Sequence, residues 1–149
     1  LDKYEFDAVI HSMAVSDFFV DNVYLESSVY ERTWNPIEEA KITSDEGVFI
    51  HLKPAPKVIR LIKEKQASTL LIGFKLLSGA SDEKLQEAAF KQMESVQSDY
   101  VLANHAEDIQ GDHHEAILLN REKEIIAKYH TKQAIAQGIV TLIEERVEK

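Results

Sequence analysis

One run of apolar residues, Leu70–Leu77, constrains the fold of this chain more than any other feature, because it is nearly continuous rather than alternating. Strands that are buried on both faces have this pattern, which is typical of parallel sheets. Two further runs, residues 7–15 and Tyr100–Ala103, are predicted to be buried strands as well. Helical patterns separate the three runs, so the sequence predicts an α/β fold with a layered sheet and helices on its faces.

Helix signals stand between these runs. The double-proline turn at 54–56 opens a helix that is predicted to extend to about Gln66. The inner face of this helix is predicted to carry Val58, Ile59 and Ile62. Ser81 and Thr131 each precede apolar residues at three- and four-residue spacing, so both are predicted to cap helices.

Residues 48–52 resemble a short strand, and residues 116–119 and 124–127 indicate an antiparallel hairpin at the C-terminal side of the fold. Residues 18–45 have no clean period, and we expect a long loop there. The loop could be disordered, but its aromatic residues favour packing on another surface, as a lid or a dimer contact. The whole of residues 1–149 is expected to be one α/β domain.

The composition excludes several classes of protein. The formal net charge is −9, which argues against a general nucleic-acid or anionic-membrane surface. There are no cysteines, so disulfides, thiolate catalysis and cysteine-based zinc sites are excluded. No apolar stretch approaches the ~20 residues that span a bilayer, and no signal peptide is visible, so a cytoplasmic location is expected.

A ligand site is predicted where the first strand ends, at His11-Ser12-Met13-Ala14-Val15-Ser16-Asp17, because open α/β sheets bind ligands at the carboxyl ends of their strands. Four lysines stand near predicted strand ends, and they could form a phosphate pocket or extend singly into solvent; they are Lys41, Lys53, Lys57 and Lys75. His113-His114-Glu115 does not have the spacing of a known metal motif, so no metal site is predicted there.

Five motifs follow one another in a familiar order, and they cover nearly the whole chain outside residues 18–38. They are Met-Ala-Val-Ser-Asp at 13–17, Ala-Lys-Ile at 40–42, Lys-Pro-Ala-Pro-Lys-Val-Ile at 53–59, Leu-Ile-Gly-Phe-Lys-Leu-Leu at 71–77 and Val-Leu-Ala-Asn at 101–104. Together they resemble the phosphopantothenate–cysteine ligases of the monofunctional bacterial kind. The resemblance implies a Rossmann-like sheet and a homodimer.

The resemblance also implies a reaction in coenzyme A biosynthesis. Members of this family use CTP, accompanied by magnesium, to activate the carboxylate of 4′-phosphopantothenate as an acyl-cytidylate. The amine of cysteine then attacks, which gives 4′-phosphopantothenoylcysteine and CMP. By the same resemblance, Lys41 is the catalytic lid residue, and the nucleotide-binding positions are His11, Ser12, Met13, Ala14, Asp17, Lys41, Pro56, Lys57, Val58, Ile59 and Phe74.

Two departures from the family pattern are visible. The residue after Ala-Asn is His105, where the family has an aspartate, and Gln92 and Val96 stand where lysines are common. The glycine-rich N-terminal part of the family is absent, so we expect this chain to be the C-terminal portion of a ligase and to be inactive alone. Two alternatives stay open: a flavoprotein of the fused decarboxylase–ligase type, and a non-catalytic dimerisation domain.

Overall fold

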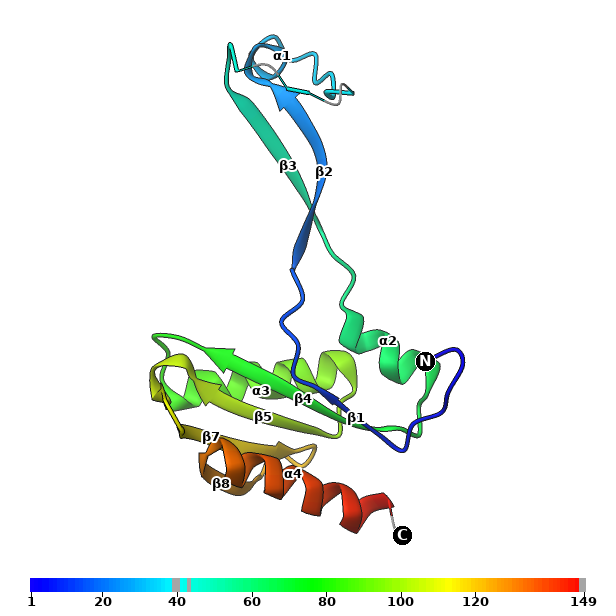
Figure 1. Ribbon diagram of the computed structural model, residues 1–149, viewed down its shortest axis with the longest axis vertical. Coiled ribbons are helices and arrows are strands. Elements are labelled where there is room, and N and C mark those ends of the chain that lie inside the picture. Colours follow the sequence, from blue (N-terminus) through cyan, green and yellow to red (C-terminus); the bar gives the residue numbers. More distant parts are fainter. Residues whose placement is uncertain (39–40, 43, 148–149) are drawn as a thin grey trace. The chain divides into compact units, whose positions relative to one another are not determined.

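The computed structural model describes residues 1–38, 41–42 and 44–147. The chain divides into two compact units (Figure 1), of which the first combines Leu1–Met13 with Val58–Lys149 and the second is Ala14–Lys57. We call the first the sheet unit and the second the ribbon unit. No helix in the described part of the chain is long and apolar enough to cross a membrane.

The sheet unit is built on a six-stranded mixed sheet. Its path runs β1-β4-β5-β7-β6, and β8 pairs with the other side of β7. The strands are β1 (Ala8–His11), β4 (Leu70–Leu77), β5 (Tyr100–His105), β6 (Ile109–Gln110), β7 (His113–Asn120) and β8 (Ile125–Thr131). The first three in the path are parallel, and the others are antiparallel, so the predicted α/β sheet and its C-terminal hairpin are confirmed.

Helices cover both faces of this sheet, which explains why its central strands are apolar throughout. On one face, α2 (Val58–Lys65) and α3 (Asp82–Val96) pack against Leu71 and Val101. On the other face, α4 (Lys132–Val147) packs against Ile72 and Leu102. Neighbouring residues of one strand thus enter different cores, and both faces of β4 and β5 are apolar over the part of each strand that the helices cover.

The helix starts follow the capping signals in the sequence. The Ser81 side chain accepts a hydrogen bond from the backbone N–H of Lys84, and Thr131 Oγ1 accepts one from the N–H of Ala134 at 3.1 Å. On α2, Ile59 and Ile62 are buried as predicted. Val58 is not: it is 43% exposed, because it lies in the first turn of the helix, where the chain has only begun to lie on the sheet.

The ribbon unit differs from the predicted long loop over residues 18–45. It contains strand β2 (Phe18–Leu25), the short helix α1 (Glu26–Tyr30) and strand β3 (Val48–Pro54). The strands β2 and β3 pair in an antiparallel ribbon, which twists along its length in Figure 1. Residues 39, 40 and 43 lie outside the described residues, so part of the predicted loop stays untested.

A β-bulge explains why the sequence pattern conceals β2. The register shifts between Val20 and Asn22, so that Asp21 is an extra residue in the strand and alternation breaks at that point. The Asp21 carboxylate accepts hydrogen bonds from Lys53 Nζ at 2.8 Å and Asn22 Nδ2 at 3.0 Å, and His51 Nδ1 lies 3.0 Å away. The neighbouring Lys53 ammonium lowers the pKa of this carboxyl, with a smaller contribution from His51.

Candidate functional site

The carboxyl ends of β1, β4 and β5 form one edge of the sheet unit, because the three strands are parallel. The helix α2 precedes β4 and runs opposite to it, so that its N-terminus lies toward the same edge. This carboxyl edge brings together, within the sheet unit, six of the predicted nucleotide-binding residues. They are His11, Ser12, Met13, Val58, Ile59 and Phe74.

His11 is the polar residue on this edge with the clearest unmet hydrogen-bonding capacity. It ends β1, beside Gly73 of β4. Its Nε2 atom is buried and finds no hydrogen-bond partner among the described residues. Because a buried, unpaired ring nitrogen is costly, a ligand that bonds to it would gain affinity at this position.

Gly73 allows the side chain of Gln92 to reach this edge from α3. A Cβ atom at position 73 would lie 3.0 Å from Gln92 Nε2 and 3.3 Å from Ile59 Cδ1. With glycine there, Gln92 Nε2 donates a hydrogen bond of 3.2 Å to the backbone carbonyl of Phe74. The bond holds the backbone of a predicted nucleotide-binding residue in place.

The loop after β4 is fastened to the segment after β5. The Glu107 carboxylate accepts hydrogen bonds from the Ser78 hydroxyl at 2.5 Å and the Gly79 N–H at 2.8 Å. The bond from Ser78 contributes most to lowering the pKa of Glu107. Nearby, His105 Nε2 lies 2.9 Å from Asp82 Oδ1, at the first turn of α3. His105, which departs from the family pattern, thus helps to fasten the start of α3 to the end of β5.

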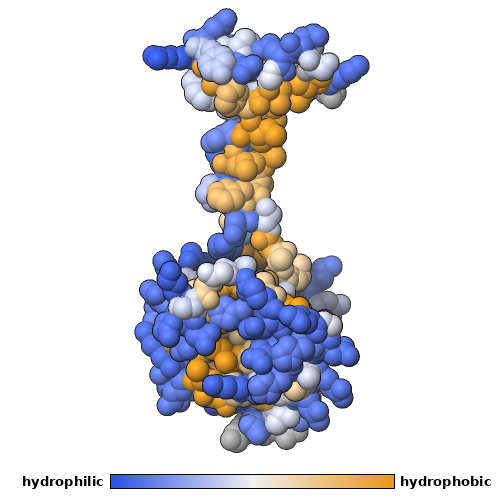
Figure 2. All heavy atoms as spheres, turned by 90° about the vertical axis from the view of Figure 1, so that its left-hand side faces the viewer, coloured by the Kyte–Doolittle hydropathy of each residue, from blue (hydrophilic) through white to orange (hydrophobic). Residues whose placement is uncertain are grey.

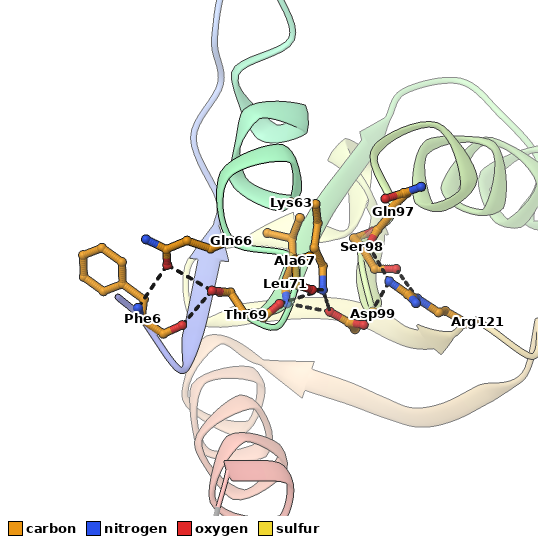
Figure 3. A network of polar contacts seen from close by, with 10 residues as sticks. All are labelled: Phe6, Lys63, Gln66, Ala67, Thr69, Leu71, Gln97, Ser98, Asp99 and Arg121. Carbon is orange, nitrogen blue, oxygen red and sulfur yellow. Dashed lines mark hydrogen bonds and ion pairs between the residues drawn. The ribbon is translucent and has the colours of Figure 1, made fainter. Parts of the chain in front are cut away.

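The opposite, amino-terminal edge of the sheet carries a network of paired polar groups (Figure 3). The Asp99 carboxylate is its centre: it accepts hydrogen bonds from Lys63 Nζ at 2.7 Å, the Leu71 N–H at 2.8 Å and Arg121 at 3.0 Å. Lys63 is buried and also donates to the carbonyl of Thr69 at 2.7 Å. A hollow of about 550 Å³ lies here. The cations that line it are already paired, so we place the candidate site at the carboxyl edge.

The ribbon unit holds the other predicted site residues. Asp17 and Lys57 form an ion pair at the base of the ribbon, close to the hydrogen bond from the Ala55 N–H to the Asp17 carbonyl. Ala14 and Pro56 are exposed. Lys41, the predicted catalytic residue, lies between α1 and β3 with an exposed side chain.

The histidines of the hairpin are not arranged around a metal ion. In the described ranges, no group of three or more His, Cys, Asp or Glu side chains is placed to hold one. His113 Nε2 and His130 Nδ1 each lie 3.5 Å from Oε1 of Glu115. His114 turns away, and both of its ring nitrogens are buried with no partner in the described structure. This burial lowers the pKa of His114, and Lys132 and His113 lower it further.

Sequence reasoning missed the contacts of Gln92 and Glu107 on this edge. The one available signal was Gly73, since a glycine inside an apolar strand often marks the close approach of another group. Nothing local to Glu107 indicates that it bonds to a loop 28 residues away.

Comparisons with known proteins fit this fold. Residues 2–147 match the family model described as DNA/pantothenate metabolism flavoprotein C-terminal domain. A curated relative, the coenzyme A biosynthesis bifunctional protein CoaBC of Thermococcus kodakarensis, is 33% identical over 141 residues. Its counterpart in Methanocaldococcus jannaschii is 24% identical over 144 residues. These matches cover 95% and 96% of the chain but 32% of each relative, so the chain spans about a third of their length.

A solved structure is also similar: the DNA/pantothenate metabolism flavoprotein from Streptococcus pneumoniae, with a TM-score of 0.83 and 31% identity. The likeness covers 95% of this chain and 64% of that one. The resemblance inferred from five sequence motifs is thereby confirmed, since the family model spans all of them. The chain belongs to the family of DNA/pantothenate metabolism flavoprotein C-terminal domains.

Proposed function

We propose that this chain is the ligase portion of a phosphopantothenate–cysteine ligase in coenzyme A biosynthesis. The observation that carries the proposal is the family match over residues 2–147, which contains all five motifs in order. Both curated relatives are named for coenzyme A biosynthesis, and they match over nearly the whole of this chain. The buried, unpaired Nε2 of His11 at the carboxyl edge supports a ligand there.

The reaction joins a carboxylate to an amine, and the carboxylate must first be activated. In the proposed sequence, an oxygen of the 4′-phosphopantothenate carboxylate attacks the α-phosphorus of CTP, and pyrophosphate leaves. The cysteine nitrogen then attacks the acyl carbon, loses a proton and displaces CMP. Magnesium enters as part of the nucleotide substrate.

In this proposal the residues of the carboxyl edge bind and orient the nucleotide. His11 offers Nε2 to a polar group of the ligand, and the backbone near Met13 and Phe74 reads the edge of the cytosine. The bond from Gln92 keeps the Phe74 carbonyl at a fixed position. For Lys41, the family resemblance alone carries the proposal that it supplies a positive charge to the phosphates in the transition state.

The proposal is tested in the protein that carries this chain, by following pyrophosphate release with 4′-phosphopantothenate and cysteine present. We expect release with CTP and much less with ATP. Equal rates with the two nucleotides would contradict base reading at this edge. No release with either would contradict the ligase assignment itself.

The role of Lys41 is tested by Lys41→Gln, which keeps a hydrogen-bond donor but removes the charge. We expect kcat to fall about a hundredfold, or ~3 kcal/mol, with little change in KM for CTP, because the charge acts in the transition state. Lys91→Gln, an exposed lysine on α3, is the matched control and should leave kcat unchanged. A change in KM alone would make Lys41 a ground-state binding residue.

A second candidate function is flavin binding, because the matching family is one of flavoprotein domains. If this chain itself binds a flavin, the purified protein or the protein mixed with FMN should show the visible absorbance bands of a bound flavin. Their presence at one flavin per chain would favour a redox role over the ligase.

A further inference from the structure

The hollow at the amino-terminal edge of the sheet unit has no role in the proposed ligase activity. Its volume is about 550 Å³, which lies within the range of about 300–1,000 Å³ that is typical of sites for small ligands. All of the residues that line it belong to the sheet unit. We call this space the edge hollow.

Part of the lining of the edge hollow is apolar. Met93, which is buried, and the half-buried Phe90 lie one turn apart on α3 and both line it. The sheet unit is mostly hydrophilic over the face drawn in Figure 2, where the apolar surface gathers on the ribbon unit. An apolar wall inside the edge hollow favours a ligand with an apolar body, because contact with such a body removes the wall from water.

Pairing does not balance the charges that line the edge hollow. Lys63 and Arg121 share the single carboxylate of Asp99, with N···O distances of 2.7 Å and 3.0 Å. Lys123 is matched by Glu94, with Nζ and Oε1 3.1 Å apart. Three cations therefore stand against two carboxylates, so the lining has a net positive charge in a chain whose net charge is −9. This excess charge favours an anion.

Arg121 also has donors that the protein does not use. Its Nε donates to the carbonyl of Ser98 at 3.1 Å, and its Nη2 donates to the carbonyl of Gln97 and contacts Asp99 (Figure 3). Its Nη1 has no hydrogen-bond or ion-pair partner among the residues that the structure describes. Two N–H groups of a fixed, charged guanidinium are thus available to a carboxylate or a phosphate.

Lys123 offers a second cation next to the apolar wall. It lies in the turn between β7 and β8, and its Nζ is 5.8 Å from the centroid of the Phe90 ring. Both Lys123 and its partner Glu94 have exposed side chains. Because an exposed ion pair contributes little free energy, the ammonium can leave Glu94 for a ligand at small cost.

We propose that the edge hollow binds a small amphipathic anion, namely an aromatic or short aliphatic carboxylate or phosphate. Its anionic group contacts Arg121 and Lys123, and its apolar body packs on Phe90 and Met93. The contacts of Asp99 are structural and hold Arg121 in position before the ligand arrives. The proposal is independent of the proposed ligase activity, because none of these residues lies at the carboxyl edge.

The two methionines of the chain allow the two edges to be observed separately. Met93 lines the edge hollow, and Met13 follows β1 at the carboxyl edge. The experiment is an NMR titration of the protein that carries this chain, isotope-labelled at its methionine methyl groups, with Met93→Leu to assign the signal. We expect phenyl phosphate or benzoate to shift the Met93 signal in a saturable way and to leave the Met13 signal in place.

The choice of probes separates the two parts of the ligand. A response to phenyl phosphate alone or to benzoate alone identifies the anionic group as a phosphate or a carboxylate. Inorganic phosphate lacks the apolar body and benzyl alcohol lacks the charge, so each should need a concentration about tenfold higher or more. CTP with magnesium should shift Met13 and not Met93, so that failure at one edge is distinguishable from failure at the other.

Two lysine substitutions with the same change of charge form a matched pair. Lys123→Glu removes a cation of the edge hollow and should weaken binding of the responding probe about tenfold. Lys91→Glu makes the same change on the exposed side of α3, outside the lining. Its effect should stay below about twofold, because salt screens a charge that does not contact the ligand.

Four results would overturn the proposal. One is a Met93 signal that neither phenyl phosphate nor benzoate shifts, and another is a Met93 signal that shifts only together with that of Met13. The third is equal weakening by Lys123→Glu and Lys91→Glu, which would assign binding to the overall charge. The fourth is binding of inorganic phosphate as tight as that of phenyl phosphate, which would leave no role for the apolar wall.

Discussion

The two edges of the sheet unit differ in how far their buried side-chain nitrogens and carboxylates find partners within the protein. At the amino-terminal edge, Asp99 joins Lys63, Arg121 and the backbone of β4, so that the charges are matched by the protein itself. At the carboxyl edge, His11 and His114 bury ring nitrogens that have no partner within the described structure. The difference fits a structural role for the amino-terminal edge and the ligand site that we propose at the carboxyl edge.

Ser98 lies at the amino-terminal edge, and its buried hydroxyl also has no partner in the described residues. Its carbonyl, however, accepts a hydrogen bond from Arg121 Nε at 3.1 Å, so its backbone belongs to the paired network. A single unpaired hydroxyl beside matched charges differs from an edge that buries three unpaired ring nitrogens, Nε2 of His11 and both of those of His114.

The largest effect is expected from Asp99→Asn. The substitution leaves the buried Lys63 ammonium without its counter-charge, which should lower the free energy of unfolding by about 3 kcal/mol, measured by urea denaturation. Asp2→Asn is the control, because Asp2 pairs with Lys65 on the exposed surface and its loss should change little. If both substitutions lowered the free energy of unfolding equally, the buried ion pair of Asp99 would contribute no more to stability than the exposed pair of Asp2.

A smaller effect is expected from Gly73→Ala at the carboxyl edge. The new methyl group displaces Gln92, so the hydrogen bond to the Phe74 carbonyl is lost, at a cost of about 1–2 kcal/mol. In a Gln92→Ala background the contact at 3.0 Å is gone and only the contact with Ile59 Cδ1 at 3.3 Å stays tight, so the same substitution should cost less. Additive effects in this double-mutant cycle would show that Gln92 does not act through Gly73.

The pH dependence of stability tests the burial of His114. Its pKa is lowered in the folded state, so the unfolded state takes up a proton first as the pH falls below about 6.5. The contribution of His114 to the free energy of unfolding is therefore fully present above that pH and is lost as the pH falls below it. His114→Phe should flatten the fall in Tm between pH 7 and pH 5, and His130→Gln, on exposed β8, should alter it less.

The smallest effect on stability is expected from His11→Leu. The substitution removes an unpaired buried nitrogen, so Tm should stay the same or rise slightly. If the carboxyl edge binds nucleotide, the same variant should lose the rise in Tm that CTP and magnesium give to the wild type. A variant that unfolds readily without ligand would instead make His11 a structural residue.

Much of the sheet unit could be predicted from the sequence. The strand Leu70–Leu77 has the bounds predicted for it, and Ser81 and Thr131 cap the helices α3 and α4. These features depend on local signals, namely apolar periodicity and capping side chains, and neighbouring residues are enough to reveal them. The same holds for the hairpin of β7 and β8.

The ribbon unit and the polar contacts of the site could not be predicted in the same way. One extra residue at Asp21 breaks the alternation of β2, so the pattern looks like a loop. The bond between Gln92 and Phe74 joins α3 to β4 and depends on how closely the two elements pack. His11 was predicted from its place at the end of an apolar run and Phe74 from resemblance to a family, and their nucleotide contacts stay a prediction.

The parallel pairing of β1 with β4 has a consequence for how this protein folds. The strands from β4 to β8 follow one another closely in sequence, whereas β1 meets Leu70 from Ala8, across the whole of the ribbon unit. The loop that must close for β1 to dock is long, so we expect β1 to join the sheet late in folding. Doubling the length of this loop would add only about 0.6 kcal/mol to the entropic cost of closing it. We therefore expect the ribbon to tolerate changes in length, as long as its two strands gain or lose residues together.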